Sequence, residues 1–202
     1  MEIINVQKRD FTVKAKKLRR LGLVPGNIFG KSLPETIAVQ IEEAVARKLI
    51  REKREGSKIT LKLDGKSYPV QIKEISLNAL TNVILNLSFQ ALKADEKVNS
   101  VAHILVTGDE KIPGILEKMT LEIPYSAFPA DMIDTAVLDI EGITAGTIIK
   151  VKDIPELMDE KIELQIDTEE FVLRVSERKS GGLVEDTETA GETEAEAEVE
   201  AE

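Results

Sequence analysis

The chain has 202 residues with 27 Lys/Arg and 37 Asp/Glu, a formal net charge of −10, one histidine and no cysteine. Disulfides and thiolate metal sites are thereby excluded, and nothing indicates an oxidising compartment. The start lacks the basic and apolar regions of a secretion signal, and no stretch nears the roughly 18 apolar residues that span a bilayer, so we expect a cytoplasmic protein with no membrane partner.

Charge is distributed unevenly along the chain. Residues 1–93 hold 18 Lys/Arg and 9 Asp/Glu, a net charge of +9, whereas residues 94–202 hold 9 and 28, a net charge of −19. Nine acidic residues and no basic one follow Gly182, a composition that cannot bury enough apolar surface to fold. We therefore predict a basic domain over 1–93, a second domain over 94–179 and a disordered acidic tail over 180–202.

The basic domain opens with a short helix predicted over Lys14–Leu21 and continues as alternating strands. Apolar residues at every second position predict a strand with one buried face. Four such runs occur: Ile37, Val39 and Ile41; Ile59, Leu61 and Leu63; Tyr68, Val70 and Ile72; Val83, Leu85, Leu87 and Phe89. Asp64-Gly65 joins the second run to the third as a tight hairpin that needs positive φ.

A second helix is predicted over Glu42–Glu55, between the first two of these strands. Apolar residues recur there every four positions, Glu43 can pair with Arg47, and Arg51 can pair with Glu55 one turn later. Gly56 supplies the C-terminal stop. An amphipathic helix of this kind packs on a sheet, so about five strands and two helices predict a small closed or partly closed β-barrel.

The second domain is predicted to be a β domain as well. Proline at positions 113, 124, 129 and 155 forbids long helices there. The strand-like runs are Ala102-Ile104-Val106, Leu121-Ile123, Val137–Ile140, Ile148–Val151, Ile162-Leu164-Ile166 and Phe171-Leu173-Val175. The predicted fold class is therefore mainly β, with an N-terminal barrel and a C-terminal β domain.

Signals of catalysis are weak throughout the chain. Residues 26–32 resemble a phosphate-binding loop, but the glycine spacing is one residue short and Pro34 stands where the helix should begin. His103 has no serine or carboxylate nearby in sequence and is expected to be a surface or satisfied structural histidine. Asp64 and Glu74 suit a turn and a solvated strand position. We expect no enzyme activity, cofactor, metal or small-molecule substrate.

Basic residues crowd the first part of the basic domain. They are Lys8, Arg9, Lys14, Lys16, Lys17, Arg19, Arg20 and Lys31, against Glu2 and Asp10. A solvated, solubilising face is one interpretation. The other is a surface for a polyanion, because basic clusters on a folded domain attract nucleic acid.

The alternation of the strands supports the second interpretation. If Leu85, Leu87 and Phe89 point inward, then Asn86, Ser88 and Gln90 point outward, as do Gln71 and Lys73. Ile28 inward likewise leaves Asn27 and Phe29 outward. Amides, hydroxyls, a ring and nearby arginines suit the wide, shallow minor groove of RNA. The candidate RNA-binding residues are Arg9, Lys14, Lys16, Arg19, Arg20, Phe29, Gln71, Lys73, Asn86 and Ser88.

Several short motifs carry a resemblance to a known family. In the first domain they are Arg9-Asp10-Phe11-Thr12, Leu18-Arg19-Arg20-Leu21-Gly22, Val24-Pro25-Gly26, Ile28-Phe29-Gly30-Lys31, Asn86-Leu87-Ser88-Phe89-Gln90 and Asp95-Glu96-Lys97-Val98. In the second they are Gly114-Ile115-Leu116-Glu117, Pro129, Val137-Leu138-Asp139-Ile140, Gly146 and Asp153. Over about residues 1–176 the chain resembles the bacterial large-subunit ribosomal protein that binds 5S rRNA, in its longer form, the general stress protein Ctc.

The resemblance implies that the barrel docks on loop E of 5S rRNA, through its open minor groove. By similarity, Arg9 and Arg20 match arginines that contact this RNA. Phe29 occupies the position of a tyrosine, Asn86 that of a histidine and Ser88 that of an aspartate, so three of the five positions depart from the family pattern. Each lost hydrogen bond costs on the order of 1 kcal/mol of binding.

Two functions follow from these observations. The first is a ribosomal protein in the cytoplasm that binds 5S rRNA through residues 1–93 while its second domain contacts neighbouring large-subunit components. The second is a diverged family member that serves as a stress-related protein-interaction module, with weak or no binding to 5S rRNA. The departures at Phe29, Asn86 and Ser88 motivate the second hypothesis.

Overall fold

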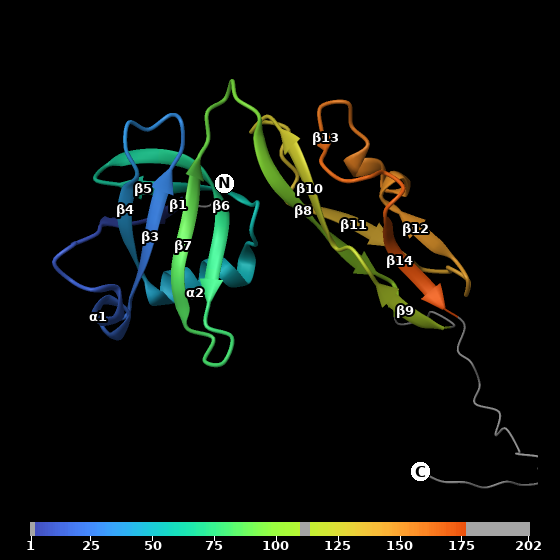
Figure 1. Ribbon diagram of the computed structural model, residues 1–202, viewed down its shortest axis with the longest axis horizontal. Helices are drawn as coiled ribbons and strands as arrows, with labels where there is room; N and C mark the ends of the chain where they lie inside the picture. The colour runs from blue at the N-terminus through green and yellow to red at the C-terminus, as the bar shows by residue number, and fades with distance from the viewer. Residues whose placement is uncertain (1–2, 110–113, 177–202) are drawn as a thin grey trace, which may run out of the picture.

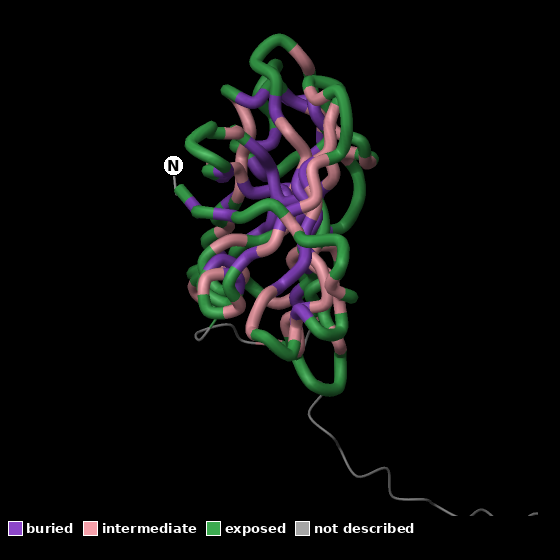
Figure 2. Tube along the Cα trace, turned by 90° about the vertical axis from the view of Figure 1, so that its left-hand side faces the viewer, coloured by how far each residue is buried: buried purple, intermediate pink, exposed green. Residues whose placement is uncertain are grey.

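The computed structural model describes residues 3–109 and 114–176, which form two β units joined by a linker between β7 and β8 (Figure 1). The tail predicted over 180–202 lies outside the described residues. The mainly β class, the two helices and the second β unit are all confirmed. Buried residues gather in the interior, and exposed residues lie mainly at the periphery (Figure 2).

The first unit is a seven-stranded sheet in the order β1-β5-β6-β7-β3-β4-β2. Its strands are β1 (Ile3–Asn5), β2 (Gln7–Lys8), β3 (Leu23–Phe29), β4 (Ile37–Glu42), β5 (Lys58–Leu63), β6 (Lys66–Leu77) and β7 (Ile84–Ala91). The two outermost strands, β1 and β2, are separated in sequence by Val6 alone. One short segment therefore pairs with both edges of the sheet, and the sheet curls into a nearly closed barrel.

Apolar side chains from every second position fill the barrel. Ile28, Val39, Ile59, Leu61, Val70, Ile72, Leu87 and Phe89 have no exposed surface. Helix α2 (Glu43–Glu52) adds Ala46 and Leu49 to this core, and α1 (Ala15–Arg20) buries Leu18. Each such side chain contributes about 1.5–3 kcal/mol relative to exposure. The predicted strand alternation is thus confirmed for most of the barrel.

Two local predictions are confirmed in detail. Asp64 and Gly65 have φ values of 49° and 80°, as a two-residue hairpin between β5 and β6 requires. Arg47 donates hydrogen bonds of 2.8 and 2.6 Å from Nε and Nη2 to Glu43 Oε1, one turn away on α2.

The end of α2 differs from the prediction, because the helix stops at Glu52 instead of Glu55. Lys53 is already extended, with φ −131° and ψ 146°. Glu55 Oε1 instead accepts a 2.7 Å hydrogen bond from the backbone N–H of Ile75 on β6. The predicted helical pair of Arg51 with Glu55 is therefore wrong, since Glu55 lies beyond the helix.

The pattern of β7 also differs from the prediction at its start, where Val83 lies before the strand and is only half-buried. Ile84, Leu87 and Phe89 are buried in the core, whereas Leu85 is only half-buried. The register of β6 with β7 steps from Ser76 opposite Asn86 to Leu77 opposite Ile84, which leaves Leu85 as the extra residue of a bulge. A bulge breaks the two-residue period, so the inward position predicted for Leu85 is wrong.

The second unit consists of two sheets packed around their own core. The first has the order β11-β8-β10-β13, and the second β12-β14-β9. Their bounds are β8 (Val98–Thr107), β9 (Ile115–Lys118), β10 (Glu122–Ala127), β11 (Thr135–Asp139), β12 (Ile148–Lys150), β13 (Glu163–Leu164) and β14 (Phe171–Ser176). Each predicted strand has a counterpart, and only β9 lacks a prediction. Ile123, Tyr125, Ile140 and Val172 lie in the core.

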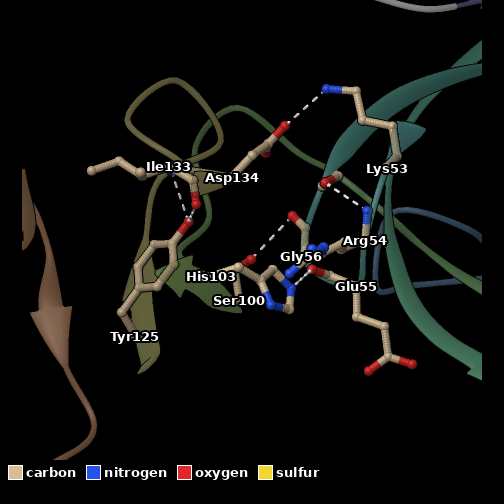
Figure 3. Close-up of polar contacts among 10 residues, drawn as sticks. Lys53, Arg54, Glu55, Gly56, Ser100, His103, Tyr125, Ile133 and Asp134 are labelled. Atoms are coloured by element: carbon tan, nitrogen blue, oxygen red, sulfur yellow. Dashed lines mark hydrogen bonds and ion pairs between the residues drawn. The ribbon is translucent and has the colours of Figure 1, made fainter. Parts of the chain in front are cut away.

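Hydrogen bonds join the two units beside β8 (Figure 3). Ser100 Oγ donates to the carbonyl of Gly56 at 3.1 Å, and His103 Nε2 lies 2.8 Å from the carbonyl of Glu55. Lys53 Nζ lies 3.1 Å from Asp134 Oδ2. His103 is 6% exposed, so the prediction of a satisfied structural histidine is confirmed.

Gly56 allows this close approach of the two units. Its φ is +85°, and a Cβ there would lie 2.5 Å from the Val101 carbonyl oxygen and 2.8 Å from Ser100 Oγ. The predicted role of Gly56 as the stop of α2 is wrong, because the helix ends four residues earlier. Glycine is required here for close packing and for a left-handed backbone.

Candidate nucleic-acid interface

A cluster of three polar side chains lies on the outer face of the barrel, on the paired parallel strands β3 and β7. Asn27 pairs with Ser88 in register. Ser88 Oγ donates to Asn27 Oδ1 at 3.1 Å, and Asn86 Nδ2 lies 3.2 Å from Ser88 Oγ and 3.4 Å from Asn27 Oδ1. We call Asn27, Asn86 and Ser88 the polar patch. Both side chains lie outside the barrel core, but only Asn86 is half-buried, whereas Ser88 is 8% exposed and therefore less accessible than the alternation predicts.

Asn27 is not among the predicted binding residues, although the sequence places it outward. The signal was its alternation with Ile28, which has no exposed surface. Its importance appears only when the parallel register of β3 with β7 sets Asn27 opposite Ser88. A pairing between strands about sixty residues apart is not visible in local sequence.

Phe29 extends this face toward the end of β3. It pairs with Gln90 on β7 and is half-buried, as predicted for an outward residue that still packs against neighbours. Paired residues of neighbouring strands share a face of the sheet. Asn27, Phe29 and Gln90, each half-buried, therefore lie on one face of the sheet, with Ser88 largely buried between them.

Gln71 lies on the same face but is covered. Its Nε2 donates to Gln90 Oε1 at 3.1 Å and to the carbonyl of Asn99 at 3.0 Å, and the residue is 0% exposed. The strand alternation correctly places it on the outer face. Its predicted exposure is wrong because the start of β8 in the second unit packs over it.

Lys73 remains exposed at the edge of this covered region. It falls at the irregular register between Ile72 and Glu74 of β6, and its Nζ donates to the Asn99 carbonyl at 3.1 Å. Because an ammonium group has three protons, this hydrogen bond to Asn99 leaves two protons for a ligand. Lys73 thus lies on the accessible side of the junction between the two units.

The basic residues of α1 lie beside β3, because Leu18 anchors the helix on the barrel. Lys14, Lys16 and Arg20 are exposed, and Arg19 is half-buried. Arg19 Nη1 donates to the Leu85 carbonyl at 3.2 Å, so the β7 bulge fixes this arginine near the polar patch. Basic residues at the last turn also stabilise the helix C-terminus.

Arg9 lies at the far side of the face, just after β2. Its guanidinium carbon is 5.9 Å from the centre of the Phe11 ring, which is 75% exposed. Its Nε is buried and has no hydrogen-bond partner within residues 3–109 and 114–176. Strands β3, β4 and β2 are neighbours at about 4.8 Å spacing, so Arg9 lies roughly 10 Å from the line of the polar patch.

The structure thus brings Asn86, Ser88, Phe29 and Arg19 together, and sets Arg9 and Lys73 on either side of them. Lys14, Lys16 and Arg20 project from α1 at one margin. The surface offers amides, a ring and cations, and the exposed carboxylate of Glu74, which pairs with Ser88 across β6 and β7, lies beside the polar patch. No carboxylate hydrogen-bonds to any member of the polar patch within the described residues.

The described residues offer a binding surface and little that resembles an active centre. Among residues 3–109 and 114–176, no group of three or more His, Asp or Glu side chains is arranged to hold a metal ion. No helix in this part of the chain is long and apolar enough to cross a bilayer. The fold and the surface describe a protein of two β units with a candidate surface for a polyanion.

Comparison with known proteins agrees with this class. Residues 4–89 match the Ribosomal L25p family, and residues 97–179 match the C-terminal domain of ribosomal protein TL5. The large ribosomal subunit protein bL25 of Chlorobium phaeovibrioides is 34% identical over 200 residues, which cover 97% of this chain and 94% of that protein. The bL25 protein of Listeria monocytogenes is 28% identical over 178 residues, which cover 86% and 84%.

The chain therefore belongs to the bL25 family of large ribosomal subunit proteins, in the longer form with two domains. The bL25 protein of Pelodictyon phaeoclathratiforme is 33% identical over 173 residues, which cover 81% of this chain and 83% of that protein. The predicted family resemblance is confirmed. The expectation of a ribosomal protein and not an enzyme is supported by this membership.

Proposed function

We propose that this protein is a structural component of the large ribosomal subunit and binds 5S rRNA through the outer face of its barrel. The observation that carries the proposal is the polar patch, a hydrogen-bonding surface with cations on both sides and no carboxylate bonded to it. Base edges and 2′-hydroxyls of an open RNA minor groove are complementary to such a surface.

The proposal assigns the residues in two groups. Asn27, Asn86, Ser88 and Phe29 face the minor groove, and Arg9, Lys14, Lys16, Arg19, Arg20 and Lys73 face phosphates. Phosphate contacts fix position, and contacts to bases fix specificity. Gln71 acts indirectly, by holding Gln90 and the second unit in place.

The proposal also assigns a separate role to each of the two domains. Residues 1–93 form the RNA-binding domain, and residues 94–179 form a second domain that contacts neighbouring ribosomal components. Two separate hydrophobic cores support this division, one ending at Phe89 and the other beginning at Ala102. The proposed place of action is the ribosome in the cytoplasm, with 5S rRNA and large-subunit components as partners.

A second function is favoured by one observation, namely that the three side chains of the polar patch hydrogen-bond to one another. Groups already satisfied within the protein gain less from an RNA partner. In this alternative the barrel is a protein-interaction module with weak affinity for 5S rRNA.

The test is a titration of the full chain against a 5S rRNA fragment that contains loop E, at two salt concentrations. A fragment with loop E replaced by a regular helix is the control. Tight binding that the control RNA lacks supports the first function. Weak binding to both RNAs, with equal dependence on salt, would support the second.

A further inference from the structure

A basic pocket lies at the junction of the two units, next to the proposed RNA-binding face. Its volume is about 290 Å³, and its walls include Lys31, Lys73, Lys93, Glu96, Lys97 and Asn99. Lys31 and Lys73 come from the barrel, Lys93 and Glu96 from the linker, and Lys97 and Asn99 from the start of the second unit. The lining thus holds four lysines and one glutamate.

The lysines of this junction pocket are only partly neutralised. Lys93 is exposed and forms no ion pair with any residue in the described part of the chain. Lys31 pairs with Glu96, and Lys97 pairs with Glu163 outside the pocket. Each ammonium has three protons to donate, so most donors remain available to an anion.

The junction pocket continues the surface of the polar patch. Gln90, which lines the pocket, lies two residues beyond Ser88 on β7 and pairs with Phe29 on β3. Two residues of a strand span about 6.6 Å. The pocket therefore lies next to the polar patch along β7.

Close packing of the ends of β3 and β7 fixes the backbone beside the lysines of the junction pocket. A Cβ on Gly30 would lie 3.1 Å from Ala91 Cβ, so the end of β3 presses against the end of β7 directly before Lys31. Lys73 Nζ is held by the Asn99 carbonyl at 3.1 Å. The walls from both units are thus fixed to one another.

We propose that the junction pocket binds a backbone phosphate of the same RNA that the polar patch contacts, so that both units of the protein hold the RNA. This inference rests on the proposed function. It adds the linker residue Lys93 and the second-unit residue Lys97 to the RNA-binding surface. Glu96 competes with the phosphate for Lys31.

The test compares paired variants of the full chain for affinity to the loop E fragment. Lys93→Gln removes a cation from the pocket, and Glu96→Gln removes the competing carboxylate. The matched controls are Lys66→Gln and Asp64→Asn, which make the same charge changes at the exposed β5–β6 hairpin. Lys66 lies seven residues from Lys73 along β6, about 23 Å away, and asparagine accepts the positive φ of position 64.

We expect Lys93→Gln to weaken RNA binding about tenfold and to lower the slope of log affinity against log salt by about 1. Glu96→Gln is expected to tighten binding, and Lys93→Arg to restore it. Both hairpin variants should stay within about twofold of the unaltered protein, because they lie outside the pocket.

Three outcomes would overturn the inference. Equal effects of Lys93→Gln and Lys66→Gln would mean that only net charge matters, while the proposed RNA binding stands. Weaker binding by Glu96→Gln would show that Glu96 supports the interface and does not compete with the phosphate. No binding of either RNA by the unaltered chain would overturn the pocket and the proposed function together.

Discussion

Ser88 and Asn27, opposite each other on two parallel strands, share a hydrogen bond of 3.1 Å from Ser88 Oγ to Asn27 Oδ1. The serine proton is therefore committed within the protein. Because the hydroxyl also accepts from Asn86 Nδ2, its remaining lone pair and the Asn27 amide protons are the groups through which this pair can meet a ligand. Asn86 and Ser88, where the resemblance leads us to expect a histidine and an aspartate, thus form an uncharged unit with Asn27.

Restoring the family residues should strengthen binding to the loop E fragment. In the triple variant Phe29→Tyr, Asn86→His and Ser88→Asp, each regained hydrogen bond contributes about 1 kcal/mol, or roughly fivefold in affinity. Asn27 can turn its amide to donate to the new carboxylate, so the patch stays satisfied. Weaker binding, measured beside the loop E control RNA, would argue that these positions do not face the RNA.

Removing an arginine from the margin of the face should weaken binding to every RNA alike. Arg20→Ala and Arg9→Ala are each expected to lower affinity and to reduce the salt slope by about 1, because a phosphate contact releases a counterion. Arg51→Ala, on the exposed side of α2, is the control. Affinities unchanged in both variants would mean that the RNA-facing surface is misassigned.

Gly56→Ala should destabilise the protein through the junction of its units. The new Cβ would lie 2.5 Å from the Val101 carbonyl oxygen, so backbone must move as well as adopt a strained φ. We expect a loss of about 2–4 kcal/mol in the free energy of unfolding. Gly65→Ala is the matched control, because its φ is +80° but nothing lies within 4 Å, and it should lose about 1 kcal/mol. Equal losses would contradict close packing at Gly56.

Lowering the pH should remove one contribution of ion pairs to the stability of the second unit. Hydrogen bonds from Lys150 and then Lys152 lower the pKa of Glu169 from 4.5 to about 2. A lowered folded pKa means that the stabilisation is complete above pH 4.5 and disappears as the pH falls toward 2. The Tm of Glu169→Gln should therefore lie below that of the unaltered chain at pH 6 and meet it near pH 2.

The control for this titration is Glu160→Gln, at an exposed glutamate that forms no ion pair within the described residues. At pH 6, the Tm of Glu160→Gln should differ from that of the unaltered chain by less than the Tm of Glu169→Gln does. A Glu169→Gln difference that persists at pH 2 would show that packing, and not charge, stabilises this site.

The sequence predicted the features that depend on neighbours in the chain. Asp64-Gly65, Glu43 with Arg47 and the inward residues of β4 and β5 all follow from local periodicity or turn chemistry. The outward face with Asn86 and Ser88 follows from the same two-residue period. Such features need only a strand or a helix to form.

The features that the sequence missed depend on distant segments. Gln71 has the right face but is covered by β8, and Asn27 joins the polar patch only through the pairing of β3 with β7. Leu85 departs from the alternation because β6 fixes a bulge opposite it. Glycine is needed at position 56 because Val101 lies so close, and not because a helix ends there.

The segment from Ile3 to Lys8 ties both edges of the barrel, pairing with β5 on one side and β4 on the other. During synthesis this segment is made before both of its partners, which end at Glu42 and Leu63. The pairing of β2 with β4 therefore needs the chain up to Glu42, whereas the pairing of β1 with β5 must wait until the chain has been made up to Leu63, and unpaired strand edges invite association between chains. The barrel of this protein therefore cannot close until the segment from Ile3 to Lys8 pairs with strands that are made after it.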